Sequence, residues 1–297
     1  MSLESYLKAG RIASEVREGA RRKYHVGSTL FEICESIEKQ IKDMGAQPAF
    51  PVNTSLNEIA AHYTAEPGDL TIVREGDVLK IDIGVHVDGY IADTAVTVCY
   101  DPKYDSLVKS AEQALVDAVR MAKANTKASD IGKTIETVIG RMGFRPIQNL
   151  SGHSLQQYVI HAGKSIPNIW TVGSSFALQQ GEAYAIEPFA TTKDGMGVVH
   201  EGKIRNIFGI TSRKPSKDSE ADKLLDTIWS RYRTLPFALR WLTDAYDEAT
   251  LRRLSDVLVK KKNIHAYPIL VEGKGKVVVQ AEHTLIPTES GATVITR

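Results

Sequence analysis

The stretch from Asp77 to Tyr100 constrains the fold more than any other part of the sequence. It is dense in Val and Ile, which favour β-strands, and the pair Asp88-Gly89 lies at its middle. An Asp-Gly pair between two such runs is a strong signal for a two-residue hairpin turn. We therefore expect two long strands that pair antiparallel around this turn.

Two acidic residues interrupt this hairpin. If Asp88-Gly89 is the turn, Asp82 lies opposite Ala95, and Asp93 lies two residues along on the same face. Diagonal neighbours across a ladder are roughly 7–8 Å apart, close enough for two carboxylates to hold cations about 3.5–4 Å apart. The alternative is that both are ordinary exposed strand residues. Because Asp is depleted in strands and like charges at this distance repel, we favour a metal site.

Three further side chains could complete such a site. His153 follows the polar segment 148–152, and Glu187 and Glu282 lie within or at the end of apolar, strand-like runs. A single histidine is more often a core or surface residue than a ligand, so His153 counts only together with its neighbours. With the two aspartates, these residues supply four carboxylates and one imidazole, a donor set that suits Co, Mn, Fe or Zn in a hydrolytic pair.

Helical periodicity flanks the hairpin on both sides. Apolar residues recur every three or four positions in four segments: residues 6–20, 30–44, 107–122 and 131–142. The second segment begins with the capping-box pattern Thr29-x-x-Glu32 and is followed by Gly45, a residue typical of helix ends.

Strand-like runs and one further helical region make up the rest of the chain. The runs are Ala183–Phe189, Gly197–Ile210, Tyr267–Glu272 and Lys276–Ile286. Residues 215–262 have a helical pattern with polar flanks. The order of helices and strands predicts an α+β fold. We expect a main domain made of residues 1–200 and 266–297, with residues 201–265 forming an insertion that contains the helical region.

Composition excludes several classes of protein. The 297 residues carry 37 basic and 36 acidic side chains mixed along the chain, so the formal net charge is +1 and no field attracts nucleic acid or an anionic membrane. No apolar run approaches the roughly 18 residues that a membrane span needs, and the first ten residues lack a secretion signal. We predict a cytoplasmic protein that binds neither nucleic acid nor a membrane.

The motifs together resemble those of type 2 methionine aminopeptidases, over nearly the whole chain. The matching segments are Asn57–Thr64, the hairpin with Asp82 and Asp93, Gly152–Ser154, Ile160–Lys164, Ile186–Pro188 and Ala281–Thr284. The order of the acidic and histidine residues, Asp, Asp, His, Glu, Glu, agrees as well. The resemblance implies a pita-bread fold, in which flanking helices cover a curved antiparallel sheet, with a helical insertion where residues 215–262 lie.

The resemblance implies a metal site with five ligands. Asp93 and Glu282 would bridge two divalent ions, Asp82 would bind one of them, and His153 and Glu187 would complete the shell of the other. A water bridging two such ions has a lowered pKa and can attack the first peptide bond. Glu187 would carry its proton to the leaving amine.

The resemblance also implies substrate contacts. His62 and His161 would contact the substrate backbone and stabilise the tetrahedral intermediate. Without its motif, His62 would be more simply a helix-end or surface histidine. Phe50, Ile160 and Tyr267 would line an apolar pocket for the methionine side chain, and each of them alone would be expected in an ordinary core.

The implied activity is removal of the initiator methionine from nascent polypeptides by a monomer, with a preference for a small second residue. Contact of the insertion with the ribosome stays open. A proline-specific aminopeptidase or prolidase of the same fold is one alternative, which the segments Ala61–Thr64 and Ile160–Gly163 and the insertion disfavour. A non-catalytic binding protein of this fold is another, which the complete ligand set disfavours.

Overall fold

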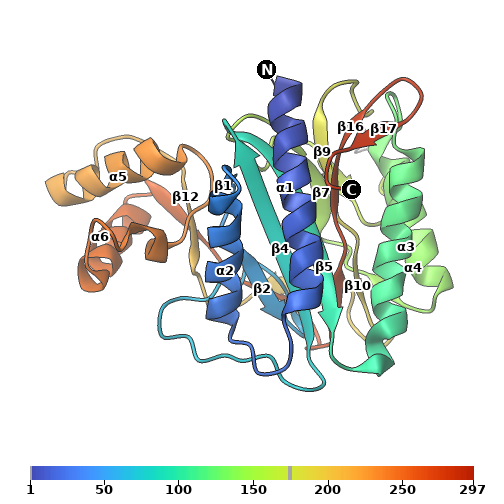
Figure 1. The fold of residues 1–297 in the computed structure, drawn as a ribbon. Helices are drawn as coiled ribbons and strands as arrows, with labels where there is room; N and C mark the ends of the chain where they lie inside the picture. The colour runs from blue at the N-terminus through green and yellow to red at the C-terminus, as the bar shows by residue number, and fades with distance from the viewer. Residues whose placement is uncertain (1, 173–175) are drawn as a thin grey trace.

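The computed structural model describes residues 2–172 and 176–297, and every pairing between its described strands is antiparallel. Helices flank the strands, as Figure 1 shows. Helix α1 (Ser2–Lys23) crosses over the long strands, α2 (Leu30–Asp43) lies beside it, and α3 (Asp105–Met121) packs against α4 (Ala128–Arg141) on the opposite side. A short 3-10 helix, η1 (Pro102–Tyr104), precedes α3. This arrangement confirms the α+β, pita-bread fold.

The predicted helix start at Thr29 is confirmed in detail. The Thr29 side chain accepts a hydrogen bond from the Glu32 backbone N–H, and the Glu32 side chain accepts one from the Thr29 N–H. This capping box satisfies two backbone donors that a helix start would otherwise leave unpaired. The helix ends just before Gly45, which has a φ of 76°.

The predicted hairpin is also confirmed, with its register. Strands β4 (Val78–Val87) and β5 (Tyr90–Cys99) pair so that Asp82 lies opposite Ala95. Asp88 and Gly89 both have positive φ, which the type I′ two-residue hairpin turn requires. Strands β1 (Gln47–Pro48) and β2 (Asn53–Leu56) pair with β4 and complete this sheet.

The strand-like runs Ala183–Phe189 and Lys276–Ile286 are not continuous strands, and this part of the prediction was wrong. The chain passes from one sheet to another within each run: β9 (Ala183–Ile186) and β16 (His283–Pro287) pair in one sheet, and β10 (Phe189–Thr191) and β15 (Val278–Gln280) pair in the next. Pro188 has no backbone N–H and cannot continue a ladder. The registers on both sides of the break bring Glu187 opposite Glu282.

The runs Gly197–Ile210 and Tyr267–Glu272 are divided in the same way. The remaining strands are β3 (Ile59–Ala61), β6 (Arg145–Pro146), β7 (Ser151–Leu155), β8 (Ser165–Pro167), β11 (Val199–Glu201), β12 (Ile207–Ile210), β13 (Ile264–Tyr267), β14 (Leu270–Glu272) and β17 (Ala292–Val294). Strand β7 lies inside a five-stranded sheet, between β8 and β9. His153 therefore lies on a strand, directly after the predicted polar segment.

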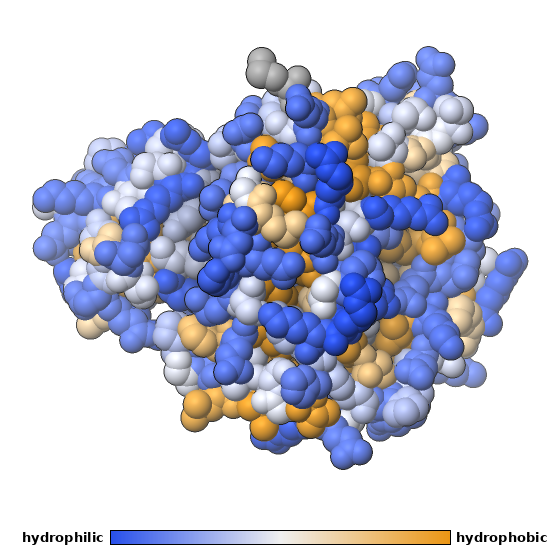
Figure 2. Space-filling view, in the orientation of Figure 1, coloured by the Kyte–Doolittle hydropathy of each residue, from blue (hydrophilic) through white to orange (hydrophobic). Residues whose placement is uncertain are grey.

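The helical region forms a lobe at the side of the molecule (Figure 1). It consists of α5 (Ser219–Tyr232), the 3-10 helix η2 (Leu239–Leu242) and α6 (Glu248–Lys260), which lie between the paired strands β12 and β13. Its helices share a hydrophobic core with these two strands, separate from the two larger hydrophobic cores of the described residues. Hydrophilic side chains cover most of its outer face (Figure 2). No helix within residues 2–172 and 176–297 is long and apolar enough to cross a membrane.

Candidate active site

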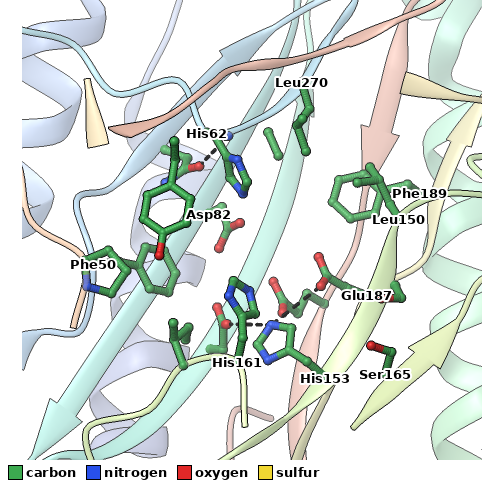
Figure 3. Close-up of a pocket in the computed structure, with 18 of the residues that line it drawn as sticks. Phe50, His62, Asp82, Leu150, His153, His161, Ser165, Glu187, Phe189 and Leu270 are labelled. Atoms are coloured by element: carbon green, nitrogen blue, oxygen red, sulfur yellow. Dashed lines mark hydrogen bonds and ion pairs between the residues drawn. The ribbon is translucent and has the colours of Figure 1, made fainter. Parts of the chain in front are cut away.

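All the predicted site residues line a single cavity of about 340 Å³. They are Phe50, His62, Asp82, Asp93, His153, Ile160, His161, Glu187, Tyr267 and Glu282. In Figure 3, Asp82, His153, His161 and Glu187 point into a common space. Residues that are far apart along the chain thus meet in the cavity.

The hairpin and the sheet crossing together position the acidic residues. Asp82 and Asp93 lie on one face of β4 and β5, and Glu282 lies at the crossing between β15 and β16. Two threonines tie these strands together: Thr94 Oγ1 donates to the Glu282 carbonyl oxygen at 2.8 Å, and the Asp93 N–H donates to Thr284 Oγ1 at 2.8 Å. The backbones that carry Asp93 and Glu282 are therefore fixed relative to each other.

The side-chain amide of Gln280 contacts three of the carboxylates. Its Nε2 lies 3.3 Å from Asp82 Oδ2, 3.5 Å from Glu187 Oε2 and 3.3 Å from Glu282 Oε2. A side-chain amide donates at most two hydrogen bonds from this nitrogen, so it cannot satisfy all three oxygens. The negative charge of the three carboxylates is therefore only partly compensated by Gln280, and a cation would compensate the rest.

His153 lies between Asp93 and Glu187. Its Nε2 lies 3.6 Å from both Asp93 Oδ2 and Glu187 Oε1. Ligand atoms of Asp93, His153 and Glu282 all lie within 4.8 Å of one another, a spacing that a single ion can bridge. Burial lowers the pKa of His153 to about 3, so its ring is neutral at pH 7, and the neutral ring is the form that binds a metal.

The electrostatics of the cluster indicate a cation. Burial raises the pKa of Asp82 to about 7, and burial followed by the charges of neighbouring acids raises the pKa values of Asp93, Glu187 and Glu282 well above their ordinary range. The buried Oδ1 atoms of Asp82 and Asp93 accept no hydrogen bond from a described residue. Orphaned carboxylate oxygens beside a neutral imidazole fit divalent metal ions.

His62 occupies the opposite side of the cavity in a strained conformation. Its φ is 66°, and its backbone N–H donates to Asn53 Oδ1 at 2.7 Å. Its Nδ1 lies 3.2 Å from the Pro268 carbonyl oxygen. Because a carbonyl can only accept, Nδ1 carries the hydrogen and Nε2 is left with a lone pair. Burial lowers the pKa of His62 to about 4, so the ring is neutral at pH 7.

Part of the cavity lining is apolar, and we call this part the apolar slot; it consists of Phe50, Ile160, Ile207, Pro236 and Tyr267. The Tyr267 ring meets the His62 ring edge to face, with 6.0 Å between centroids. A Cβ at Gly84 would overlap the Phe50 ring, so the glycine makes room for it. The position of the Phe50 ring in the slot therefore depends on glycine at position 84.

Sequence reasoning missed several residues of the site, among them Asn53 and Pro236, which line the cavity, and Gln280, which hydrogen-bonds to its carboxylates. Gln280 could have been found, because it precedes Glu282 by two residues and strand residues two apart share a face. Asn53 and Pro236 carry no local signal, because their roles depend on His62 and on the packing of the insertion. His161 was found, and its ring lies 4.5 Å from that of His153, centroid to centroid.

Comparison with known proteins agrees with this geometry. The model for metallopeptidase family M24 matches residues 4–211. The methionine aminopeptidase of Pyrococcus horikoshii is 45% identical over 296 residues, which cover 100% of both chains. Two solved structures share the fold: a thermophilic Arx1 (TM-score 0.84, 17% identity, 99% of this chain and 90% of that one) and a methionine aminopeptidase from Rickettsia prowazekii (TM-score 0.71, 18% identity, 100% and 97%).

Proposed function

This chain belongs to metallopeptidase family M24, and within it to the methionine aminopeptidases, and from this premise we propose how its cavity removes an N-terminal methionine. The observation that carries the proposal is the convergence of four carboxylates and one imidazole beside an apolar slot. The slot would hold the methionine side chain, and the acidic cluster would lie at the first peptide bond.

Asp82, Asp93, His153, Glu187 and Glu282 would hold two divalent ions. The orphaned oxygens and the shared Gln280 donor support this assignment. An oxygen-rich set with one imidazole accepts Co, Mn, Fe or Zn. Such ions would lower the pKa of a bound water and polarise the peptide carbonyl.

Glu187 is the best placed of the acids to move a proton. It lies at the break after β9, its side chain is partly open to the cavity, and its Oε1 faces His153. A carboxylate in this position can take a proton from the attacking water and deliver it to the leaving amine.

The two cavity histidines would bind the substrate backbone in different ways. With Nδ1 committed to Pro268, His62 presents Nε2 as a hydrogen-bond acceptor, which suits a substrate N–H. His161, accessible from the cavity beside His153, would then be the one to stabilise the oxygen of the tetrahedral intermediate. This assignment narrows the role that the sequence suggested for His62.

The substrate would be the N-terminal methionine of nascent polypeptides with a small second residue, processed by a cytoplasmic monomer. The full-length identity to the Pyrococcus horikoshii enzyme favours methionine over a proline-specific activity. The near-zero net charge supports neither a nucleic-acid partner nor a membrane partner. We place the boundaries of the insertion at residues 201–265.

The test uses metal-stripped protein and the tripeptide Met-Ala-Ser. We expect no cleavage without metal and restored cleavage after addition of Co, Mn, Fe or Zn in separate reactions. An Ala-Pro peptide serves as the control for the proline-specific alternative. Faster cleavage of the Ala-Pro peptide, or no cleavage of Met-Ala-Ser with any of the four metals, would contradict the proposal.

A further inference from the structure

A buried arginine of the insertion, Arg240, extends into the main domain and contacts α2 and the segment that follows His62. Arg240, in η2, has a side chain that is only 2% exposed. Its guanidinium forms ion pairs with Glu35 and Glu38 of α2. It also donates to Thr64 Oγ1 at 3.0 Å and to the Ala65 carbonyl oxygen at 3.1 Å. One side chain thus joins the insertion, α2 and the segment that follows His62.

Glu38 extends this connection to the segment that contains Val52. Its Oε1 accepts from the Val52 backbone N–H at 3.1 Å, and its Oε2 accepts from Trp241 Nε1 at 2.6 Å. Thr64 Oγ1 donates in turn to the Val52 carbonyl oxygen at 2.8 Å. We call this pair, Arg240 and Glu38 with their contacts, the Arg240–Glu38 clamp.

The two segments held by the clamp carry cavity residues. Val52 lies between Phe50 and Asn53 in the sequence. Phe50 forms a wall of the apolar slot, and the side chain of Asn53 accepts a hydrogen bond from the backbone N–H of His62. Thr64 lies two residues after His62. The positive φ of His62 makes its position dependent on such external contacts, because this conformation costs free energy on its own.

The insertion also reaches the facing wall of the cavity. Thr234 Oγ1 hydrogen-bonds to the Tyr158 carbonyl oxygen, in the loop that carries Ile160 and His161. Pro236 itself lines the cavity. Among the described residues, the contacts of Arg240 and Glu38 reach none of the five side chains proposed to bind metal.

We propose that Arg240 and Glu38 are positioning residues for substrate binding: through them, the insertion fixes the Phe50 wall of the apolar slot and His62 relative to the metal ligands. The inference rests on the proposed function, and it assigns the insertion a part in recognising the methionine end of the peptide. The Phe50 wall and His62 would contact the bound substrate, so a shift of the segments that carry them would weaken substrate binding without touching the reacting atoms.

The test compares Arg240→Met and Glu38→Gln with the intact protein. At saturating metal we expect KM for Met-Ala-Ser to rise about tenfold or more, since the slot loses its fixed wall, while kcat changes less than about threefold. Metal affinity, measured by calorimetry, should stay unchanged. A merely structural role would lower the melting temperature and leave KM unchanged in the folded fraction.

Arg253→Met is the matched control. Arg253 pairs with Glu220 at 2.6 Å in the same lobe, but the two side chains are 55% and 64% exposed. Within residues 2–172 and 176–297, neither side chain forms a hydrogen bond or ion pair with a residue that lines the cavity. We expect KM to stay unchanged in this variant. If Arg240→Met does not fold, Glu38→Gln and Arg240→Lys are judged by the same criteria.

Two results would overturn the proposal: an unchanged KM in folded Arg240→Met and Glu38→Gln, or a loss of metal affinity that parallels the loss of activity. Inactivity of the intact protein towards Met-Ala-Ser would instead contradict the proposed function. The unmodified protein is therefore measured first.

Discussion

The two sides of the cavity are built by different means. On the acidic side, Asp82, Asp93 and His153 lie within paired strands, and Glu187 and Glu282 face each other where two pairs of strands cross between sheets. The residues Phe50, His62, Ile160 and His161, which we call the loop side, come instead from connecting segments that side-chain contacts hold in place. We therefore expect changes on the acidic side to alter metal binding, and changes on the loop side to alter substrate turnover with the metals retained.

Asp93→Ala should have the largest effect of the variants proposed here. An active variant that keeps its metal would contradict the contrast between the acidic side and the loop side. Asp93 is one of the five proposed metal ligands, and metal ions supply several kcal/mol of transition-state stabilisation, which corresponds to about 1,000-fold or more in kcat. Steady-state kinetics and metal analysis of the purified protein measure both consequences. The exposed Asp194, paired with Lys276, is the control: Asp194→Ala should keep full activity and metal content.

His62→Asn tests the loop side. We expect kcat/KM to fall about 100-fold, because one oriented hydrogen-bonding group at the reacting bond is lost, while two ions remain bound. Kinetics and metal analysis of the same sample give the two values. Loss of metal together with activity would show that the two sides are not separable.

The pH dependence of stability sharpens the account of the acidic side. Burial raises the folded-state pKa of Asp82 from 3.8 to about 7. Its contribution to stability is therefore fully present below about pH 4 and is lost as the pH rises through about 7. The two neutral histidines of the cavity, His62 and His153, have lowered pKa values and change the free energy of unfolding in the opposite sense, so the effect of Asp82 is measured against Asp82→Asn. Between pH 5 and pH 8, urea unfolding of metal-free protein should give a change in the free energy of unfolding that is more negative by about 2 kcal/mol in the intact protein than in Asp82→Asn.

Saturating Mn is the control for this measurement. In the intact protein it should make the change between pH 5 and pH 8 less negative than in the metal-free protein, since bound cations favour the charged carboxylates. An equal change in the metal-free intact protein and in Asp82→Asn would mean that Asp82 does not contribute to the pH dependence.

Thr284→Val should have the smallest effect. Loss of the hydrogen bonds between Thr284 and the Asp93 backbone should weaken metal binding about tenfold, the lower range for groups that support metal ligands. Calorimetric titration with Mn measures it. Thr191→Val is matched, because the Thr191 hydroxyl is also buried and donates to the Val277 carbonyl oxygen at 2.8 Å, away from the ligands. Equal losses in both variants would remove the special role of Thr284.

The same contrast explains what the sequence could predict. The hairpin register and the placement of Asp82 and Asp93 on one face followed from a local turn signal and a period of two, and the structure confirms both. The crossing of strands at Glu187 and Glu282 was not predicted, because a continuous apolar run does not show where a chain leaves one sheet for another. Pro188 alone predicted that a strand must end or run along an edge at this position, because proline has no backbone N–H.

The loop side was much less accessible to sequence reasoning. His62 and Phe50 were identified through family motifs, whereas Asn53 and the Arg240–Glu38 clamp were missed. Arg240 lies roughly 200 positions from its partner Glu38, and no periodicity or turn rule relates two such residues. Contacts that depend on tertiary packing alone leave no local pattern.

The central claim is that these five side chains hold a pair of metal ions. Diffraction data collected at the Mn absorption edge, from crystals grown with saturating Mn, test it most directly. The account predicts two anomalous peaks about 3.5–4 Å apart within reach of Asp82, Asp93, His153, Glu187 and Glu282. A cavity without a peak, or peaks that leave Glu187 and Asp82 uncoordinated, would contradict it.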